Sequence, residues 1–160
     1  MEKKTTVKRA PMKKWVNSKK TVIDGITFDS GRESDMYRLL KESGIEFDYI
    51  GGENAKYPIL DELTYEGECY ERAQKRSKEM KSVSKVSGAG YTPDFRAKDE
   101  SWFIEVKGRK LGDFSMRWKL FKAFLSTREP KPMLFMPVTM GDCIQVINIL
   151  KGKKDEAKEK

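Results

Sequence analysis

The chain has 160 residues, of which 36% are charged and 38% hydrophobic, so it is long enough for one domain with a lean core. It contains no histidine, which excludes Ser-His-Asp and Cys-His catalysis, histidine-metal nucleases and Cys₂His₂ zinc fingers. No apolar run approaches the roughly 20 residues of a membrane span, and the first residues lack the apolar segment of a secretory signal. Cys69 and Cys143 match no metal spacing, so we expect reduced thiols in a cytoplasmic protein.

The net charge of +8 lies almost entirely near the two ends of the sequence. Residues 1–20 carry +7 and residues 151–160 carry +2, which leaves −1 for residues 21–150. We therefore expect a basic flexible N-terminal arm, a central domain over 21–150 and a lysine-rich tail. A basic arm on a nearly neutral domain is typical of nucleic-acid binding, with a solubilising segment as the alternative. The candidate phosphate contacts in the arm are Lys13, Lys14, Lys19 and Lys20.

The first part of the domain predicts a hairpin, a helix and two strands. Residues 21–28 suit a pair of short strands, because Asp24-Gly25 is a strong turn signal between apolar segments. An apolar stripe at helical spacing predicts a helix over about 30–43. Alternating apolar and acidic residues predict a strand over 45–50, and 57–60 is a further strand candidate.

Residues 66–87 are expected to form a helix. Cys69, Ala73, Met80 and Val83 recur at helical spacing and would share one face. Two interpretations remain open for the basic residues around that face, of which Arg72, Lys75 and Arg76 are the candidates for binding DNA. They would lie on successive phosphates of a duplex, or they would only solvate the helix.

The second part of the domain predicts strands over 91–97 and 101–107, joined by a charged turn, and a helix over 113–127. A strand over 133–138 follows, and the apolar run 143–149 suits a strand or a short helix. Strands and helices in this order favour an α/β sandwich around a mixed sheet.

Two short segments carry the strongest functional signal. Residues 91–95 read Tyr-Thr-Pro-Asp-Phe, and residues 103–108 read Phe-Ile-Glu-Val-Lys-Gly. Strand alternation places Glu105 and Lys107 on one face, with Asp94 one hairpin away. Two carboxylates beside an ammonium can hold Mg²⁺ next to a water, as phosphodiester hydrolysis requires. The alternative is a turn aspartate and a solvated Glu/Lys pair.

These segments resemble the PD-(D/E)xK nuclease superfamily, with Pro93-Asp94 followed by Glu105-Val106-Lys107. Together with Ser-Gly-x-Glu at residues 30–33, their order is similar to the phage endonuclease I type of Holliday junction resolvase and to small phage nucleases. The resemblance covers about residues 26–126. It implies a restriction-endonuclease-like αβββαβ core, in which a mixed sheet is flanked by helices.

The resemblance also implies a Mg²⁺-dependent endonuclease, with Mn²⁺ as a substitute ion. Asp94 and Glu105 would bind the metal with the carbonyl of Val106 as a further ligand, and Lys107 would orient the attacking water or stabilise charge. Glu33 would complete a metal shell or position the nucleophile, while a capping box with Ser30 is its structural alternative. Further basic residues expected to contact DNA are Arg109, Lys110, Arg117, Lys119 and Lys122.

The expected substrate is branched DNA, in a DNA recombination pathway of a phage within its bacterial host. Resolving a four-way junction needs two coordinated cuts, so we expect a homodimer. Two alternatives remain open: a nuclease of restriction, nicking or transposition type that acts on ordinary duplex, and a non-catalytic nucleic-acid-binding protein.

Overall fold

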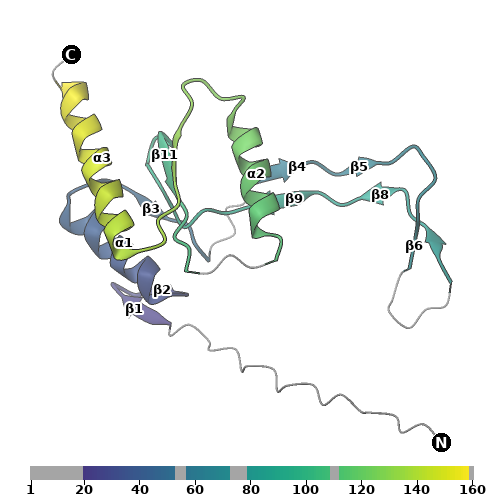
Figure 1. Cartoon of the computed structure of the whole chain (residues 1–160), viewed down its shortest axis with the longest axis horizontal. Coiled ribbons are helices and arrows are strands. Elements are labelled where there is room, and N and C mark those ends of the chain that lie inside the picture. Colours follow the sequence, from purple (N-terminus) through teal and green to yellow (C-terminus); the bar gives the residue numbers. More distant parts are fainter. Residues whose placement is uncertain (1–19, 53–56, 73–78, 109–111, 159–160) are drawn as a thin grey trace, which may run out of the picture.

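The computed structural model describes residues 20–52, 57–72, 79–108 and 112–158 (Figure 1). This part of the chain is a mixed α/β protein with three helices and several small sheets, and without a closed barrel. Its central sheet has the strand order β12-β11-β10-β3. The strands are β3 (Asp48–Tyr49), β10 (Phe95–Arg96), β11 (Trp102–Ile104) and β12 (Met133–Phe135). β10 is antiparallel to both of its neighbours, whereas β11 and β12 are parallel.

Helices cover both faces of the central sheet. α1 (Gly31–Glu42) and α3 (Met140–Lys158) pack on one face, where the buried cluster includes Met36, Ile104 and Val146. α2 (Phe114–Leu125) covers the other face, where the buried cluster includes Phe103, Trp118 and Phe121. The predicted α/β class and the helices expected over 30–43 and 113–127 are therefore confirmed. None of the described helices is long and apolar enough to cross a membrane.

The last apolar run forms a helix, which settles the alternative that the sequence left open. Cys143, Val146, Ile147 and Leu150 are all buried against the sheet. Their spacing of three, four and seven residues suits one face of a helix and not a strand. α3 continues to Lys158, through the first residues of the expected lysine-rich tail.

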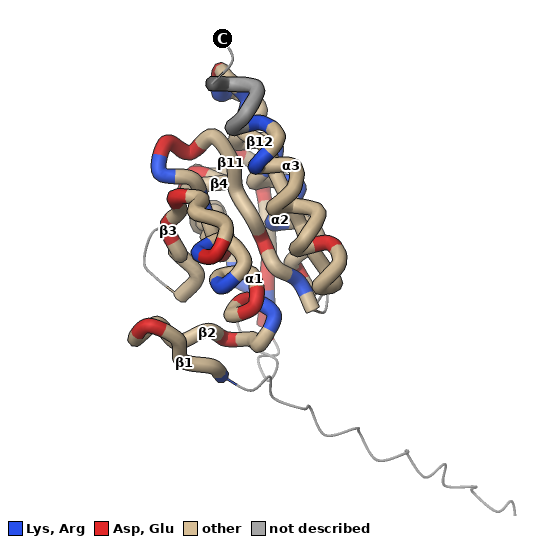
Figure 2. The backbone as a smooth tube through the Cα atoms, turned by 90° about the vertical axis from the view of Figure 1, so that its left-hand side faces the viewer, with Lys and Arg blue, Asp and Glu red and all other residues tan. Residues whose placement is uncertain are grey.

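The hairpin predicted at 21–28 is present beside α1 (Figure 2). β1 (Thr21–Ile23) and β2 (Ile26–Phe28) join through Asp24 and Gly25, whose φ angles of 52° and 78° suit a tight two-residue turn. The Asp24 carboxylate accepts hydrogen bonds from Tyr37 and Lys41 of α1, at 2.8 and 2.6 Å. These contacts tie the hairpin to the helix.

The helix predicted over 66–87 is wrong for the part of it that the structure describes. Residues 57–72 and 79–91 instead form three nested antiparallel pairs, which we call the β-ribbon. Residues of a strand alternate between two faces, and the charged residues at 81 and 85 fit this spacing as well as a helical one. From base to tip the pairs are β4 (Tyr57–Leu60) with β9 (Ala89–Tyr91), β5 (Leu63–Thr64) with β8 (Lys85–Val86), and β6 (Tyr70–Glu71) with β7 (Lys81–Ser82).

Candidate active site

Asp94 and Glu105 lie opposite each other at the open end of the β10–β11 hairpin. The pairing of Phe95 with Ile104, continued by one residue, places the two acidic residues in register. The backbone N–H of Val106 donates to Asp94 Oδ2 at 2.6 Å. On the other side, the N–H of Ile50 donates to the Asp94 carbonyl oxygen at 2.9 Å. Asp94 is therefore held between two strands, with its carboxylate directed toward the end of β11.

Glu105 is almost completely buried, and its two oxygens have different surroundings. Its Oε1 accepts a hydrogen bond from Lys107 Nζ at 2.6 Å, so the predicted placement of both side chains on one face is confirmed. Its Oε2 is buried without a hydrogen-bond partner among the described residues. Lys107 Nζ also lies 4.4 Å from the ring centroid of Phe114, at the start of α2. A buried carboxylate oxygen without a donor is costly unless a proton or a cation neutralises it.

Glu33 joins this site from the first turn of α1. Its backbone N–H donates to Ser30 Oγ at 3.2 Å, and Ser30 Oγ donates to Glu33 Oε1 at 2.7 Å. The predicted capping interaction is therefore confirmed, although the side chain also accepts from Asp29 N–H and Tyr49 Oη, each at 3.3 Å. The charge of Glu33 nevertheless acts on Asp94 and Glu105, since it raises the pKa of both carboxyl groups.

The pKa values at the site reflect burial and mutual repulsion. Burial raises the pKa of Asp94 well above its usual value, and the charges of Glu105 and Glu33 raise it further. Burial also raises the pKa of Glu105, partly offset by the hydrogen bond from Lys107. Like charges in a desolvated site disfavour the ionised state of each other. Lys107 is the one cation paired with these three carboxylates within the described residues, so their negative charge is only partly neutralised.

These residues suit a Mg²⁺ ion in their chemistry but do not form a closed cage. Mg²⁺ prefers oxygen ligands, keeps several waters and is commonly held by only one or two carboxylates. Asp94 and Glu105 supply two carboxylates, and Glu105 Oε2 makes no regular hydrogen bond within the described residues, with the Tyr91 hydroxyl close to it. Within the described ranges, however, no group of three or more Asp, Glu or Cys side chains is close enough to hold an ion. Glu33 therefore contributes charge rather than a ready third ligand.

Tyr91 was not predicted as part of the site. Its ring packs 4.7 Å from that of Phe121 on α2, and its buried Oη has no hydrogen-bond partner among the described residues. Burial raises its pKa, and the charge of Glu105 together with a hydrogen-bonding interaction with that carboxylate raises it further. The phenol is therefore a potential donor beside Glu105, although its geometry falls short of a regular hydrogen bond. The available signal was its position at the start of Tyr-Thr-Pro-Asp-Phe. The chain bends at Asp94, between β9 and β10, so the position of Tyr91 relative to Glu105 does not follow from strand alternation.

Arg32 was missed as well. Its Nη1 donates to the Lys107 carbonyl oxygen at 3.5 Å, which links the start of α1 to the end of β11. The residue directly precedes Glu33, but the sequence contained no indication that the two segments meet.

The residues predicted to bind DNA fall into two groups. Those within the described chain are exposed: Lys20, Arg72, Arg117, Lys119 and Lys122. Lys20 pairs with Asp29 at 3.3 Å, while Arg117 bonds Asp113 and the Gly90 carbonyl and so ties α2 to β9. The remaining candidates lie outside the described residues: Lys13, Lys14, Lys19, Lys75, Arg76, Arg109 and Lys110.

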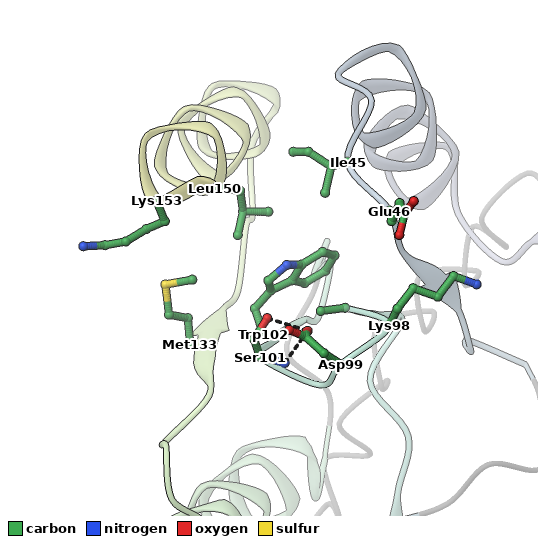
Figure 3. Close-up of a pocket in the computed structure, with 10 residues that line it drawn as sticks. Ile45, Glu46, Lys98, Asp99, Ser101, Trp102, Met133, Leu150 and Lys153 are labelled. Carbon is green, nitrogen blue, oxygen red and sulfur yellow. Dashed lines mark hydrogen bonds between the residues drawn. The ribbon is translucent and has the colours of Figure 1, made fainter. Parts of the chain in front are cut away.

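A cavity of about 600 Å³ lies at the other end of the same hairpin (Figure 3). Trp102, Met133 and Leu150 form its apolar wall, and Glu46 and Asp99 lie at its rim. Asp99 is bonded to Ser101, and Lys98 is paired with Asp48. The cavity is therefore separate from the carboxylate cluster, and none of its lining residues belongs to that cluster.

Fold and site together define a mixed α/β protein with a buried cluster of carboxylates at one edge of its sheet. Residues 12–131 match the family described as "Protein of unknown function (DUF1064)", and the chain belongs to this family. The match includes the carboxylate cluster and the β-ribbon. The chain matches no curated protein and no solved structure.

Proposed function

We propose that this protein is a metal-dependent DNA endonuclease that hydrolyses phosphodiester bonds. The observation that carries the proposal is the pair Asp94 and Glu105, aligned across the open end of one hairpin with Lys107 beside them. Buried carboxylates that repel each other and have raised pKa values are stabilised by a proton or by a bound cation, and a bound divalent cation is the state we propose for the active protein. Perturbed carboxylates of this kind are more frequent at functional sites than elsewhere.

The order of the core elements supports the same proposal. α1, β3, β10, β11, α2 and β12 follow one another in the chain, and the β-ribbon is inserted between β3 and β10. This is the αβββαβ order that the nuclease resemblance implies. The acidic pair occupies adjacent antiparallel strands, as a Pro-Asp and Glu-x-Lys pattern requires.

Each residue of the cluster has a definite part in the proposed reaction. Asp94 and Glu105 would hold Mg²⁺ or Mn²⁺, with the Val106 carbonyl as a further ligand. When bound, the ion supplies charge that polarises the phosphate and makes a bound water more acidic. Lys107 holds the Glu105 carboxylate in place and presents a positive charge to the phosphate. Glu33 adds negative charge that strengthens cation binding, and through Ser30 it fixes the start of α1.

The proposed substrate is branched DNA, cut by a homodimer in the cytoplasm of a bacterial host. Exposed cations on the face of α2, Lys119 and Lys122, lie on the helix that carries Phe114 beside Lys107 and would contact the backbone near the cut. Nicking or cutting of ordinary duplex is the second candidate, because the cluster itself carries no preference for branched substrates.

The test is a cleavage assay on junction, linear duplex and single-stranded DNA, with and without Mg²⁺. We expect Mg²⁺-dependent cleavage of the junction by the wild type and by Glu46→Gln, a control at the other end of the sheet. Asp94→Asn should bind the junction without cutting it. Cleavage that survives in Asp94→Asn would refute the site, and absence of cleavage on every substrate would leave the non-catalytic binder as the better description.

A further inference from the structure

Two buried side-chain atoms in the described part of the chain form no regular hydrogen bond, and both belong to the open end of the β10–β11 hairpin. One is Glu105 Oε2, which is an acceptor, and the other is Tyr91 Oη, which can donate. The two residues are only 3% and 7% exposed, so solvent is not an alternative partner for either atom. Buried polar groups are almost always paired, and each of these atoms offers what the other lacks.

The effect of each group on the pKa of the other shows that the two are close. Burial raises both pKa values. Hydrogen bonding by Lys107 and by the Tyr91 hydroxyl lowers the pKa of Glu105, while the charge of Glu105 and hydrogen bonding to it raise the pKa of Tyr91. A bond from a phenol to a carboxylate favours the charged acid and the neutral phenol, which gives these signs. The phenol is therefore the donor and the carboxylate the acceptor.

Contacts with α2 hold the Tyr91 hydroxyl beside Glu105. Tyr91 is the last residue of β9, and its ring centroid lies 4.7 Å from that of Phe121 on α2. Arg117 of the same helix donates to the Gly90 carbonyl at 3.2 Å, which fixes the backbone next to Tyr91. The phenol is thus positioned by a helix outside the hairpin that carries Glu105.

Tyr57 has a comparable position at the turn end of the hairpin. It is the first residue of β4, it is buried, and its ring centroid lies 5.6 Å from that of Phe121. Its Oη donates to Glu100 at 2.6 Å and accepts from Arg96 at 3.0 Å. Both tyrosines therefore pack on the same helix residue, but each lies beside a different carboxylate. This makes Tyr57 a matched control for Tyr91.

We propose that Tyr91 is a positioning residue for Glu105: its hydroxyl donates to Oε2, as Lys107 donates to Oε1, so both oxygens of the carboxylate are held in place. A carboxylate oxygen has two lone pairs, so Oε2 can accept from the phenol and still face a cation. Partners of this kind orient metal-ligating carboxylates, and their loss commonly costs about 10–100-fold in metal affinity. The effect on a cation rests on the proposed metal site, whereas the hydrogen bond itself does not.

The first test measures the hydrogen bond without metal, by urea denaturation of the full chain. It uses a double-mutant cycle with Glu105→Met, which keeps an unbranched side chain but removes the carboxylate. We expect Tyr91→Phe, which retains the ring on α2, to shift the unfolding equilibrium about tenfold toward the unfolded state in the wild-type background, and much less beside Glu105→Met. A Tyr91→Phe protein as stable as the wild type or more stable, or an equal loss in both backgrounds, would overturn the proposal.

The second test is a Mn²⁺ titration of the full chain without DNA, followed by electron paramagnetic resonance. Tyr91→Phe should weaken Mn²⁺ binding about tenfold or more, whereas Tyr57→Phe should bind Mn²⁺ as the wild type does. Unchanged or tighter binding by Tyr91→Phe, or equal weakening in Tyr57→Phe, would show that the Tyr91 hydroxyl does not position Glu105 for a cation. A wild type that binds no Mn²⁺ would instead refute the proposed metal site, and the denaturation cycle then decides the hydrogen bond by itself.

Discussion

The acidic side chains at the two ends of the β10–β11 hairpin have opposite electrostatic surroundings. At the turn end, Asp48 is paired with Arg96 and Lys98, at 3.3 and 2.6 Å. Glu100 there is paired with Arg96 and Arg128. Both of these carboxylates therefore have a cation within the chain, and the ion pairs join β3, β10, the turn and the segment that follows α2.

At the open end, acidic groups face one another instead. Asp94, Glu105 and Glu33 repel each other, and Lys107 pairs with one oxygen of Glu105. The pKa values follow this difference. The hydrogen bond from Lys98 lowers the pKa of Asp48, and hydrogen bonds from Tyr57 and Arg128 lower that of Glu100 against the effect of burial. Burial and repulsion raise the pKa of Asp94 and Glu105. Carboxylates at the turn end are neutralised by cations of the chain, whereas those at the open end are buried and repel each other, as is more frequent at functional sites.

The largest expected effect is loss of cleavage at the open end. Asp94→Asn or Glu105→Gln should abolish cleavage of junction DNA in Mg²⁺, because each removes one of two charged ligands. Binding of the junction should be unchanged or tighter, since a carboxylate that repels phosphate is gone. Gel-shift and cleavage assays on the same preparations separate the two properties. Undiminished cleavage by either variant would show that the contrast between the two ends has no catalytic meaning.

A second prediction concerns Lys107, whose ammonium group pairs with Glu105. Lys107→Ala should lower turnover by about 10²–10³-fold if Lys107 stabilises charge at the phosphate. It should also cost about 1–3 kcal/mol of stability, because buried Glu105 loses its partner. The control Lys107→Ala/Glu105→Gln should recover stability but not activity. Recovery of both would contradict a catalytic part for this pair.

Glu33→Gln distinguishes the two parts assigned to Glu33. Glutamine can replace glutamate in a capping box, so a capping residue alone predicts nearly normal turnover. A residue that acts through its charge on the metal site predicts reduced turnover, together with a higher Mg²⁺ concentration for half-maximal rate. Measuring turnover against Mg²⁺ concentration decides between these outcomes, and α1 should remain intact in both.

The next prediction concerns stability: removing a carboxylate should destabilise the protein at the turn end of the hairpin and stabilise it at the open end. At pH 7, Glu100→Gln should lower the free energy of unfolding by about 1–2 kcal/mol, because it leaves Arg96 and Arg128 without their shared partner. Asp94→Asn should raise that free energy, because it removes a charge that burial and repulsion disfavour, while its side-chain oxygen can still accept from Val106. Urea denaturation without divalent cations measures both. If both substitutions changed the free energy of unfolding in the same direction, the two ends of the hairpin would not differ as we infer.

The gain from Asp94→Asn should depend on pH. A carboxyl group with a raised pKa in the folded state favours folding when protonated, and this contribution is lost as pH rises from about 4, the unfolded value, through the folded pKa. The stability difference between wild type and Asp94→Asn should therefore be small near pH 4 and should grow toward pH 7. A stability difference that does not change with pH would show that ionisation of Asp94 does not destabilise the folded wild type.

The smallest expected effect concerns regions outside the hairpin. Deleting residues 1–20 removes a charge of +7 and should weaken DNA binding. If three phosphate contacts are lost, the slope of log K against log salt should change by roughly 2–3. Slow cleavage at low salt should persist, because the carboxylate cluster is intact. An unchanged salt slope would mean that the N-terminal arm only aids solubility.

Much of the fold could be predicted because its signals are local. The Asp24-Gly25 turn, the α1 capping residues and the alternation of Glu105 and Lys107 each depend on residues a few positions apart, and the structure confirms all three. The β-ribbon could not be predicted in this way. Its register shifts between the β5–β8 and β6–β7 pairs, so the period-two pattern is interrupted between residues 64 and 70, and helical spacing fitted better.

The candidate site shows the same difference between local features, which the sequence predicts, and contacts between distant segments, which it does not. Asp94, Glu105 and Lys107 form one hairpin, so their proximity follows from the sequence. The approach of Tyr91 and Arg32 does not, since it depends on the bend at Asp94 and on the packing of α1 against the end of β11. Burial of Glu105, from which its raised pKa follows, likewise depends on the position of α2.

We infer that the open end of the hairpin binds a divalent cation and that the turn end does not. A Mn²⁺ titration followed by electron paramagnetic resonance tests it without DNA and without turnover. The wild type and Glu46→Gln should bind Mn²⁺ alike, Asp94→Asn and Glu105→Gln should lose that binding, and excess Mg²⁺ should displace the ion. Equal Mn²⁺ binding by the wild type and by both open-end variants would contradict the proposed metal site.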